Sequence, residues 1–442
     1  MALKKIVATV FVILFVAVLN PMDVRAQAMP QQKRVALIAN YYAISSHANA
    51  LATKFFVGFP TDEGMIPSQI KIVSVWIDQP SPDSSGKKGV ADVGRKIAKK
   101  NGAKIYPTIA EALTLGGDKL AVDAVIYIGE HGEYPRSRLG VKMYPRLNFL
   151  EQIFRVFDAS NKVVPVYTDK ALAYSWLDAK WIYDRSKELN VPLMAGSVLP
   201  YSWRDPILQH PVGTKITEAV AVGYGALDSY GFHVAEILEC MLERRKGGET
   251  GVASVQGLKG PAVWKAADEG KFSMKLVEEA CNRIKGKSNG SMREVVKEPI
   301  AILVNYKDGT KGAILMLSGY VGEGWGYAAT AGGKTTGCEF VLESTTNAHF
   351  SYLGLNIQNF FQTGKAPAPL ERTLLTGGIL DTGIRSIAEG GKLTETPFLN
   401  MHYSVEGYTP IIPSHSRPLG QSVGPWPPAG YEFIVPQPAT TK

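Results

Sequence analysis

The 442-residue sequence predicts an α/β protein in which an N-terminal parallel sheet precedes an α+β domain with a mainly antiparallel sheet. From Arg34 to about Lys170, short apolar runs alternate with helical patterns, as expected for strands joined by crossover helices. Beyond Ile216, strand-like runs follow one another closely, and Asp308-Gly309 between two of them is a hairpin signal. The composition is ordinary for a globular protein, with 45 % hydrophobic and 20 % charged residues. The length allows two domains with ample cores.

The first half of the chain indicates strands at 35–39, 70–77, 104–106, 122–128, 163–167 and 191–195, and helices at 46–57, 90–101, 108–113, 147–159 and 175–189. Ser175 and Asp178 form a capping box at the start of the last helix, and Asn190 is a suitable stop. Strands separated by helices favour right-handed crossovers, so we expect the strands to pair in parallel.

The second half indicates strands at 216–223, 301–306, 312–318, 325–330 and 338–344, and helices at 233–244, 352–363 and within 370–389. The chain is rich in proline from Tyr408, and we expect this tail to have no regular structure. The predicted organisation is a leader at 1–28, a first domain at 29–170, a second domain at 171–407 and a tail at 408–442.

The N-terminus has the features of a secretory signal. Lys4 and Lys5 precede an apolar run at 6–19, and small residues follow Pro21 at Ala26 and Ala28. The alternative, an uncleaved anchor, is disfavoured because the run is shorter than the roughly 20 residues that span a bilayer. We therefore expect Sec-type export to the periplasm or the cell exterior, with no membrane association after cleavage.

Charge and cysteine content exclude some functions. The formal net charge of +8 is scattered along the chain without interleaved aromatic residues, which favours a solvated surface over nucleic-acid binding. The three cysteines, Cys240, Cys281 and Cys338, form no C-x-x-C motif. We expect three reduced, buried thiols, with one disulfide and one free thiol as the alternative.

Residues 34–56 read as a buried strand, a turn and a helix, which is the opening of a Rossmann-like dinucleotide-binding unit. Such a turn normally carries G-x-G-x-x-G, because bare backbone approaches the pyrophosphate. Here Ala39, Tyr41 and Ile44 stand in the three glycine positions. Asp78 ends the next strand, where an acid would bind the ribose of NAD, although a loop-capping role is the alternative. The scaffold is typical of a dehydrogenase, but its cofactor turn is altered.

Several stretches together resemble the glucose–fructose oxidoreductase and inositol dehydrogenase (Gfo/Idh/MocA) family over nearly the whole mature length. They are His47-Ala48, GAKIYPTIAEAL at 102–113, VDAV at 122–125, TDKALA at 168–173, PLMAG at 192–196, GFHVAE at 231–236, and 370–397. The resemblance implies a Rossmann domain, a sugar-like substrate and hydride transfer to NAD or NADP. It places Lys170 and His233 beside the substrate hydroxyl. A homo-oligomer is also consistent with the family.

The sequence departs from the family pattern at several points. Asp169 precedes Lys170 where the family has Glu, Ala171 follows where it has Pro, and Glu236 replaces an Asp. The turn from Gly129 to Gly132 holds an acid and a histidine where the family commonly has a Pro-Asn-like turn. Together with the missing glycines, these departures put the cofactor in question.

Candidate site residues follow from these patterns. Lys170 and His233 are the candidate catalytic residues, against the alternatives of a surface lysine and a core histidine. Candidate cofactor contacts are Ala39, Tyr41, Asp78, Gly129, Glu130 and His131; candidate substrate contacts are Tyr134, Trp203 and Arg204. The single Glu130–His131 pair is too small for a zinc site, so no metal is expected. His47 is expected to be structural, and Glu236 is expected to lie on a helix surface, with orientation of His233 as the alternative.

Two classes of function remain open from the sequence. The first is an exported oxidoreductase that acts on a sugar or polyol with a nicotinamide cofactor. The second keeps the scaffold without the redox step: a secreted carbohydrate-binding protein, or a lyase or hydrolase that uses Glu130, His131, Lys170 and His233 as acids and bases. Fold alone does not decide between them, because function resides in the site.

Overall fold

The computed structural model describes residues 32–79, 93–419 and 426–436. The expected leader at 1–28 and the first residues of the helix expected at 90–101 lie outside these ranges. No helix within them combines the length and apolarity needed to cross a membrane.

The first half of the chain forms a six-stranded sheet in the order β5-β4-β1-β6-β7-β8, with every pair parallel. Its strands are β1 (Lys33–Tyr41), β4 (Ile70–Gln79), β5 (Lys104–Ile105), β6 (Ala124–Ile128), β7 (Val166–Asp169) and β8 (Leu193–Gly196). This is the strand order of dinucleotide-binding folds, and the direction in which successive strands are added reverses between β1 and β6. The predicted parallel sheet is confirmed. It continues to Gly196, past the expected domain boundary at residue 170.

Apolar side chains on alternating strand positions bury both faces of this sheet. Helices α3 (Ile109–Thr114), α4 (Arg146–Ser160) and α5 (Trp176–Glu188) pack on one face, through residues such as Ile38 and Val125. The π-helical turn η1 (Ala48–Ala52), α1 (Lys54–Val57) and α2 (Val93–Lys100) pack on the other, with Leu37 and Ala39. The single helix expected at 46–57 is therefore two short pieces, followed by a small hairpin of β2 (Phe59–Thr61) and β3 (Gly64–Ile66).

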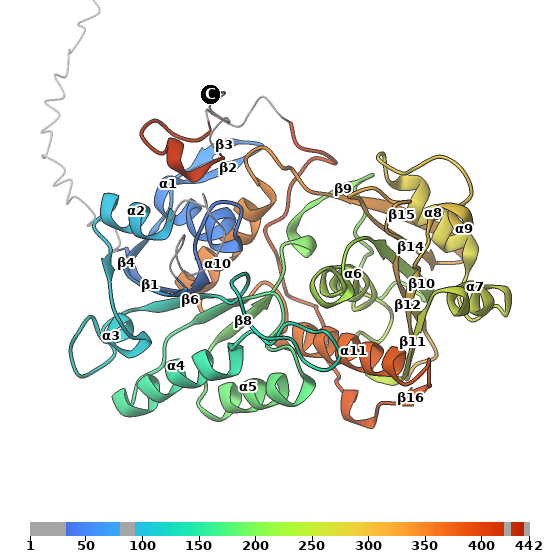
Figure 1. Cartoon of the computed structure of the whole chain (residues 1–442), viewed down its shortest axis with the longest axis horizontal. Coiled ribbons are helices and arrows are strands. Elements are labelled where there is room, and N and C mark those ends of the chain that lie inside the picture. The colour runs from blue at the N-terminus through green and yellow to red at the C-terminus, as the bar shows by residue number, and fades with distance from the viewer. Residues whose placement is uncertain (1–31, 80–92, 420–425, 437–442) are drawn as a thin grey trace, which may run out of the picture. The chain divides into compact units, whose positions relative to one another are not determined.

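The second half forms an eight-stranded sheet in the order β16-β11-β12-β13-β10-β14-β15-β9, in which only β10 and β13 pair in parallel (Figure 1). Its strands are β9 (Trp203–Asp205), β10 (Ile216–Gly223), β11 (Val252–Lys259), β12 (Ile300–Tyr306), β13 (Lys311–Met316), β14 (Trp325–Ala331), β15 (Lys334–Val341) and β16 (Thr394–Glu395). The mainly antiparallel sheet and the hairpin at Asp308-Gly309 are confirmed.

Helices cover this second sheet on both faces (Figure 1). Helices α7 (Pro261–Asp268), α8 (Met274–Arg283) and α9 (Met292–Val295) share one apolar cluster with it. On the other face lie α6 (Leu227–Leu242) and α11 (Leu370–Ala388), and α11 also contacts α5 and β8 of the parallel sheet. Helix α10 (His349–Thr363) packs against η1 and β2, so the second half of the chain returns to the first sheet.

The tail from Tyr408 has no strand in its described part and is fixed by hydrogen bonds. Asn356 exchanges two hydrogen bonds with Ile411, and Leu419 N donates to Asp62 Oδ1 at 3.0 Å. Short 3₁₀ turns occur at η2 (Leu199–Tyr201), η3 (Pro397–Leu399) and η4 (Glu432–Ile434). Cys240, Cys281 and Cys338 are all buried and free, as expected.

The contact between β11 and α11 depends on two glycines, and it gives a test of the packing. A Cβ on Gly257 would lie 2.1 Å from the carbonyl oxygen of Gly383, a backbone atom that cannot rotate away. We expect Gly257→Ala to lower the free energy of unfolding by about 1–3 kcal/mol through overpacking. Gly286→Ala is the control, because a Cβ there meets nothing within 4 Å. Urea unfolding of the two variants checks this, and equal stabilities would contradict the packing.

Candidate functional site

A cavity of about 470 Å³ lies where the carboxyl ends of β6 and β7 face the start of α6. Ligands of open α/β sheets bind at this edge, and the volume lies within the range of small-molecule sites. The cavity is lined by chemically active side chains from both halves of the chain, including His47, Glu130, His131, Lys170, Tyr230, His233 and Trp325. The structure thus brings Lys170 and His233 into one site.

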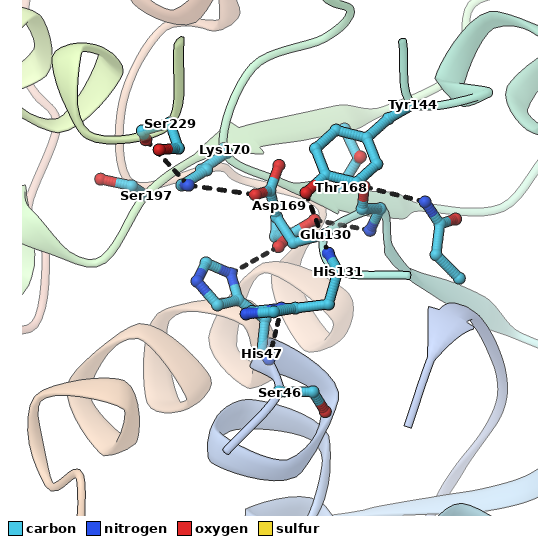
Figure 2. Close-up of polar contacts among 12 residues, drawn as sticks. Ser46, His47, Glu130, His131, Tyr144, Thr168, Asp169, Lys170, Ser197 and Ser229 are labelled. Atoms are coloured by element: carbon cyan, nitrogen blue, oxygen red, sulfur yellow. Dashed lines mark hydrogen bonds and ion pairs between the residues drawn. The ribbon is translucent and has the colours of Figure 1, made fainter. Parts of the chain in front are cut away.

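Lys170 directly follows β7, at the carboxyl edge of the parallel sheet. Its backbone is left-handed, with a φ of 55°, which is uncommon for a residue with a side chain. Its Nζ donates to Glu130 Oε2 at 3.1 Å and to the carbonyl oxygen of Ser229 at 3.0 Å (Figure 2). An ammonium group has three hydrogens, so one is left for a ligand in the cavity.

Glu130, at the end of β6, joins Lys170 to a buried arginine. Its second carboxylate oxygen accepts from Arg146, the first residue of α4, whose side chain is only 2 % exposed. Burial alone would raise the pKa of Glu130, but the Lys170 and Arg146 charges outweigh it and hold that pKa well below its usual range. Glu130 is therefore a carboxylate at neutral pH, and its first role is to balance these two cations.

Asp169 is the second buried carboxylate beside Arg146. Its Oδ1 accepts from the Gly129 amide at 2.7 Å, and its Oδ2 lies 2.8 Å from His47 Nδ1. Burial opposes ionisation of Asp169, but Arg146 and the hydrogen bond from His47 lower its pKa. His47, expected to be structural, lines the cavity instead, with a side chain 21 % exposed. The orientation of its ring depends on Asp169, which lies 122 residues away, so no local sequence pattern could predict it.

His233 lies in the second turn of α6 and is 8 % exposed. Its ring contacts Trp325 edge-on, with centroids 5.6 Å apart. Burial and the positive charge of Lys170 lower its pKa well below the usual value, so the imidazole is neutral. Its Nδ1 is buried and has no hydrogen-bond partner within the described ranges, which leaves Nε2 as the nitrogen that can meet a ligand.

Glu236, expected on a helix surface, is instead buried at 1 % exposure. Its Oε2 accepts from the Ser197 amide at 2.8 Å and from the Ser197 hydroxyl. The surface prediction was wrong because the buried face of α6 extends around the helix to contact the end of β8. Burial raises the pKa of Glu236 to about 6, against the lowering effect of these hydrogen bonds.

The raised pKa of Glu236 makes a prediction about stability and pH. Because the folded-state pKa is above the unfolded value, the contribution of Glu236 to stability is complete at pH values below the ordinary carboxyl pKa and is lost as pH rises through about 6. We expect Glu236→Gln to remove this decrease in the free energy of unfolding between acidic and neutral pH, which is on the order of 2 kcal/mol. Urea unfolding of both proteins at acidic and neutral pH measures it. A variant that differs from the parent equally at both pH values would refute the assignment.

The candidate substrate contacts Trp203 and Arg204 do not line the cavity. Trp203 is 1 % exposed, and its Nε1 donates to Asp62 Oδ2 at 2.7 Å. Arg204 donates to the carbonyl oxygens of Pro200 and Leu208 and stacks on Phe340. The expectation was wrong because β9 pairs with β15 at an edge of the second sheet, where both side chains serve packing.

The candidate cofactor residues on β1 and β4 are also held by protein groups. Ala39 is completely buried between Ile77 and Ile128, and Tyr41, 8 % exposed, pairs with Gln79 in the sheet. Asp78 Oδ2 accepts from the Tyr134 hydroxyl at 2.7 Å. Asp78, the proposed ribose ligand, and Tyr134, the proposed substrate contact, thus bond to each other, and neither lines the cavity.

The turn after β1 tests whether a dinucleotide fits. In this fold the pyrophosphate binds to free backbone amides at the start of the first helix. Here four of these amides donate to protein acceptors: Ser45 N to Asn49 Oδ1, Ser46 N to Ala43 O, His47 N to His131 Nδ1, and Asn49 N to Ser46 Oγ.

The bond from His47 N to His131 Nδ1 is 3.2 Å long and joins the turn after β1 directly to the turn after β6 (Figure 2). Those turns flank the place where the strand order reverses, which is where a dinucleotide crosses such a sheet. The Gly129 amide, close to His131, already donates to Asp169. The Glu130 carboxylate already pairs with Arg146 and Lys170. These residues do not fit a nicotinamide dinucleotide in the usual binding mode. In the described part of the chain, no cluster of three or more potential metal ligands occurs either.

No protein-family model matches this sequence, and none of the curated proteins matches it. Among solved structures, the chain is similar to GenD2 from gentamicin A biosynthesis in complex with NAD, with 13 % identity and a TM-score of 0.53 over 82 % of this chain and 96 % of that one. It is also similar to myo-inositol 2-dehydrogenase from Lactobacillus plantarum, with 11 % identity and a TM-score of 0.51 over 83 % and 99 % of the two chains.

A third similar structure is the apo scyllo-inositol dehydrogenase from Lactobacillus casei, with 9 % identity and a TM-score of 0.51 over 82 % of this chain and 98 % of that one. At such low identity these matches establish the fold and nothing finer. Across almost the whole length of each neighbour, the chain has the two-sheet fold of these dehydrogenases, which is the fold that the resemblance to the Gfo/Idh/MocA family implied.

Proposed function

We propose that the protein is an enzyme that binds a sugar or polyol in the cavity and acts on it by proton transfer at a hydroxyl group. The observation that carries this proposal is the convergence of Lys170 and His233 on one cavity at the carboxyl edge of the parallel sheet. Lys170 has an ammonium hydrogen left over after its bonds to Glu130 and Ser229. It donates that hydrogen to the substrate oxygen and stabilises negative charge that develops there.

His233 has a complementary role in this proposal. Because its pKa is well below neutrality, it stays uncharged and accepts the hydrogen of a substrate hydroxyl at Nε2. A depressed pKa also makes it a weak proton acceptor, so it orients the hydroxyl better than it removes the proton. Lys170 and His233 therefore bind separate hydroxyl groups of the substrate in the cavity.

The aromatic wall of the cavity supports a sugar or polyol as the substrate. Tyr230 is 39 % exposed, and its ring is nearly parallel to that of Trp325, with an interplanar angle of 8° and centroids 5.8 Å apart. The open ring face suits the C–H face of a carbon ring, while Lys170 and the histidines suit its hydroxyls. Aromatic rings and hydrogen-bonding side chains in one cavity are what support this substrate class.

A second candidate is an oxidoreductase that removes hydride from the same substrate and passes it to NAD or NADP. The observation that favours it is the fold, which is shared with dehydrogenases that include a structure in complex with NAD. Against it stand the four occupied amides and the bond between His47 and His131. Nucleotide binding would require these bonds to open, so we derive no step through the cofactor.

The test is to incubate the purified protein with a panel of sugars and polyols in D₂O and follow the mixture by NMR without added nucleotide. The proposal predicts that at least one compound gives a new product in this mixture. If turnover begins only when NAD or NADP is added and reduced nicotinamide accumulates, the oxidoreductase replaces our proposal. If no compound reacts either with or without nucleotide, the protein is not an enzyme for any compound of the panel. The proposal of an enzyme then fails, and carbohydrate binding replaces it.

We further propose that the protein is exported after removal of residues 1–28. The basic start, the short apolar run and the small residues at Ala26 and Ala28 support this. Expression of the full chain in a bacterial host, followed by mass spectrometry of the periplasmic fraction, tests it. Recovery of the intact chain from the cytoplasm alone would contradict export.

A further inference from the structure

We propose that His47 is the general base of the site and that Asp169 positions it, an inference that rests on the proposed function. The proposed mechanism lacks a strong proton acceptor, because His233 is buried and its pKa is depressed. His47 lines the same cavity from the residue that precedes η1. A buried carboxylate that accepts from one nitrogen of an imidazole, while the other nitrogen faces the substrate, is the usual construction of a histidine base.

The geometry at Asp169 fixes which nitrogen of His47 carries the hydrogen. Asp169 Oδ1 already accepts from the Gly129 amide at 2.7 Å, and Arg146 donates to the backbone oxygen of Asp169 at 2.6 Å. The other oxygen, Oδ2, lies 2.8 Å from His47 Nδ1 (Figure 2). Because an ionised carboxylate only accepts hydrogen bonds, the hydrogen must sit on Nδ1, and in the neutral imidazole the lone pair is then on Nε2.

His47 Nε2 is open to the cavity. It makes no hydrogen bond with any residue in the described ranges. Since it is not a buried atom without a partner, it is accessible to a ligand. The His47 side chain is 21 % exposed, whereas the Asp169 side chain is 3 % exposed. The pair therefore presents a basic nitrogen to the ligand and keeps its carboxylate away from water.

The backbone of His47 is held as firmly as its ring. The amide donates to His131 Nδ1, and the ring lies edge-on to Phe350 of α10, with centroids 5.5 Å apart. In the proposed step, the O–H bond of the substrate hydroxyl breaks, its electron pair stays on oxygen, and a new N–H bond forms at His47 Nε2. Asp169 stabilises the resulting imidazolium, and Lys170 stabilises the alkoxide.

The tautomer of His47 tests the pair independently of any activity. Long-range ¹H–¹⁵N NMR spectra of the seven histidines, assigned with His47→Gln, report which nitrogen carries the hydrogen. We expect the Nδ1–H form for His47 in the native protein and a shift toward the Nε2–H form in Asp169→Asn. Should Asp169→Asn fail to fold, the spectrum of the native protein still shows which nitrogen of His47 carries the hydrogen. The Nε2–H form in the native protein would overturn the proposal even if a substrate is found.

Kinetics then test the role of the pair in catalysis. With any compound that reacts, we expect His47→Gln to lower kcat by about 10²- to 10⁴-fold and to leave KM nearly unchanged, as for loss of a general base. His402→Gln is the matched control, because His402 is exposed and its hydrogen bond is to Asn400. An unchanged kcat in His47→Gln would overturn the proposal. If no compound reacts, the proposed function fails, and the tautomer alone decides whether the Asp169–His47 pair exists.

Discussion

Replacing Arg146 by methionine is expected to lower the free energy of unfolding by about 3–5 kcal/mol, the usual cost of leaving buried charges without a partner. The Arg146 side chain is 2 % exposed and contacts two carboxylates, those of Glu130 and Asp169, which are 9 % and 3 % exposed. Methionine fills much of the same space but supplies no charge. Asp169 then loses the cation that most lowers its pKa, and Glu130 keeps only Lys170 of its two cations.

The matched control for this stability test is Arg155→Met on the same helix. Arg155 is 74 % exposed and pairs with Glu151 one turn away. Such exposed pairs contribute at most about 0.5 kcal/mol. Urea unfolding of both variants at neutral pH gives the comparison. A loss for Arg146→Met as small as that for Arg155→Met would mean that the buried ion cluster does not hold the site together.

Replacing Lys170 by methionine is expected to lower turnover by about 10²- to 10⁴-fold, because the ammonium group proposed to stabilise charge on the substrate oxygen is lost. The backbone at residue 170 is left-handed, and methionine meets the same strain there as lysine, so the main chain should not move. The reaction identified in the sugar and polyol panel supplies the assay, and kcat and KM are measured separately.

Two controls accompany the Lys170 variant. Lys180→Met removes a lysine that is 44 % exposed and bonded to Asp184, and it should retain full turnover. The melting temperature of Lys170→Met shows whether the variant is folded. A folded Lys170→Met with the turnover of the parent would remove Lys170 from the mechanism and leave the cavity without its electrostatic centre.

The sequence predicts the fold well because the two sheets have different local patterns. Apolar runs separated by helices predict the parallel strands from β1 to β8, and the close spacing with Asp308-Gly309 predicts the β12–β13 hairpin. The strand β11 and the helices α7 to α9 are not among the elements predicted from the sequence, although α8 has a helical pattern, with Ser273 as its N-cap and Leu276 and Ala280 on its buried face. Their places depend on long-range packing, such as the approach of Gly257 to Gly383.

The site is predicted only in part, and the reason is again the distance between partners in the sequence. Lys170 and His233 could be found because each stands in a short motif. The role of His47 depends on Asp169, and the burial of Glu236 depends on Ser197. Trp203, an expected sugar contact, instead donates to Asp62, 141 residues away.

The altered turn illustrates the same limit. The missing glycines at Ala39, Tyr41 and Ile44 show in the sequence that the turn is unusual, but they do not show what replaces the pyrophosphate. In the structure His131, 84 residues away, accepts the hydrogen bond from the His47 amide. No local pattern predicts this replacement, because the hydrogen bond forms only when folding brings the turns after β1 and β6 together.

The most direct measurement is the melting temperature of the purified protein with NAD, with NADP, and with the sugar or polyol that reacts, each at millimolar concentration. A ligand that binds the native state raises the melting temperature by mass action. We predict a rise with the sugar or polyol and none with either nucleotide, because protein acceptors already hold the amides around His47. A rise with NAD or NADP would contradict this account and restore a dehydrogenase that opens its turn to bind the cofactor.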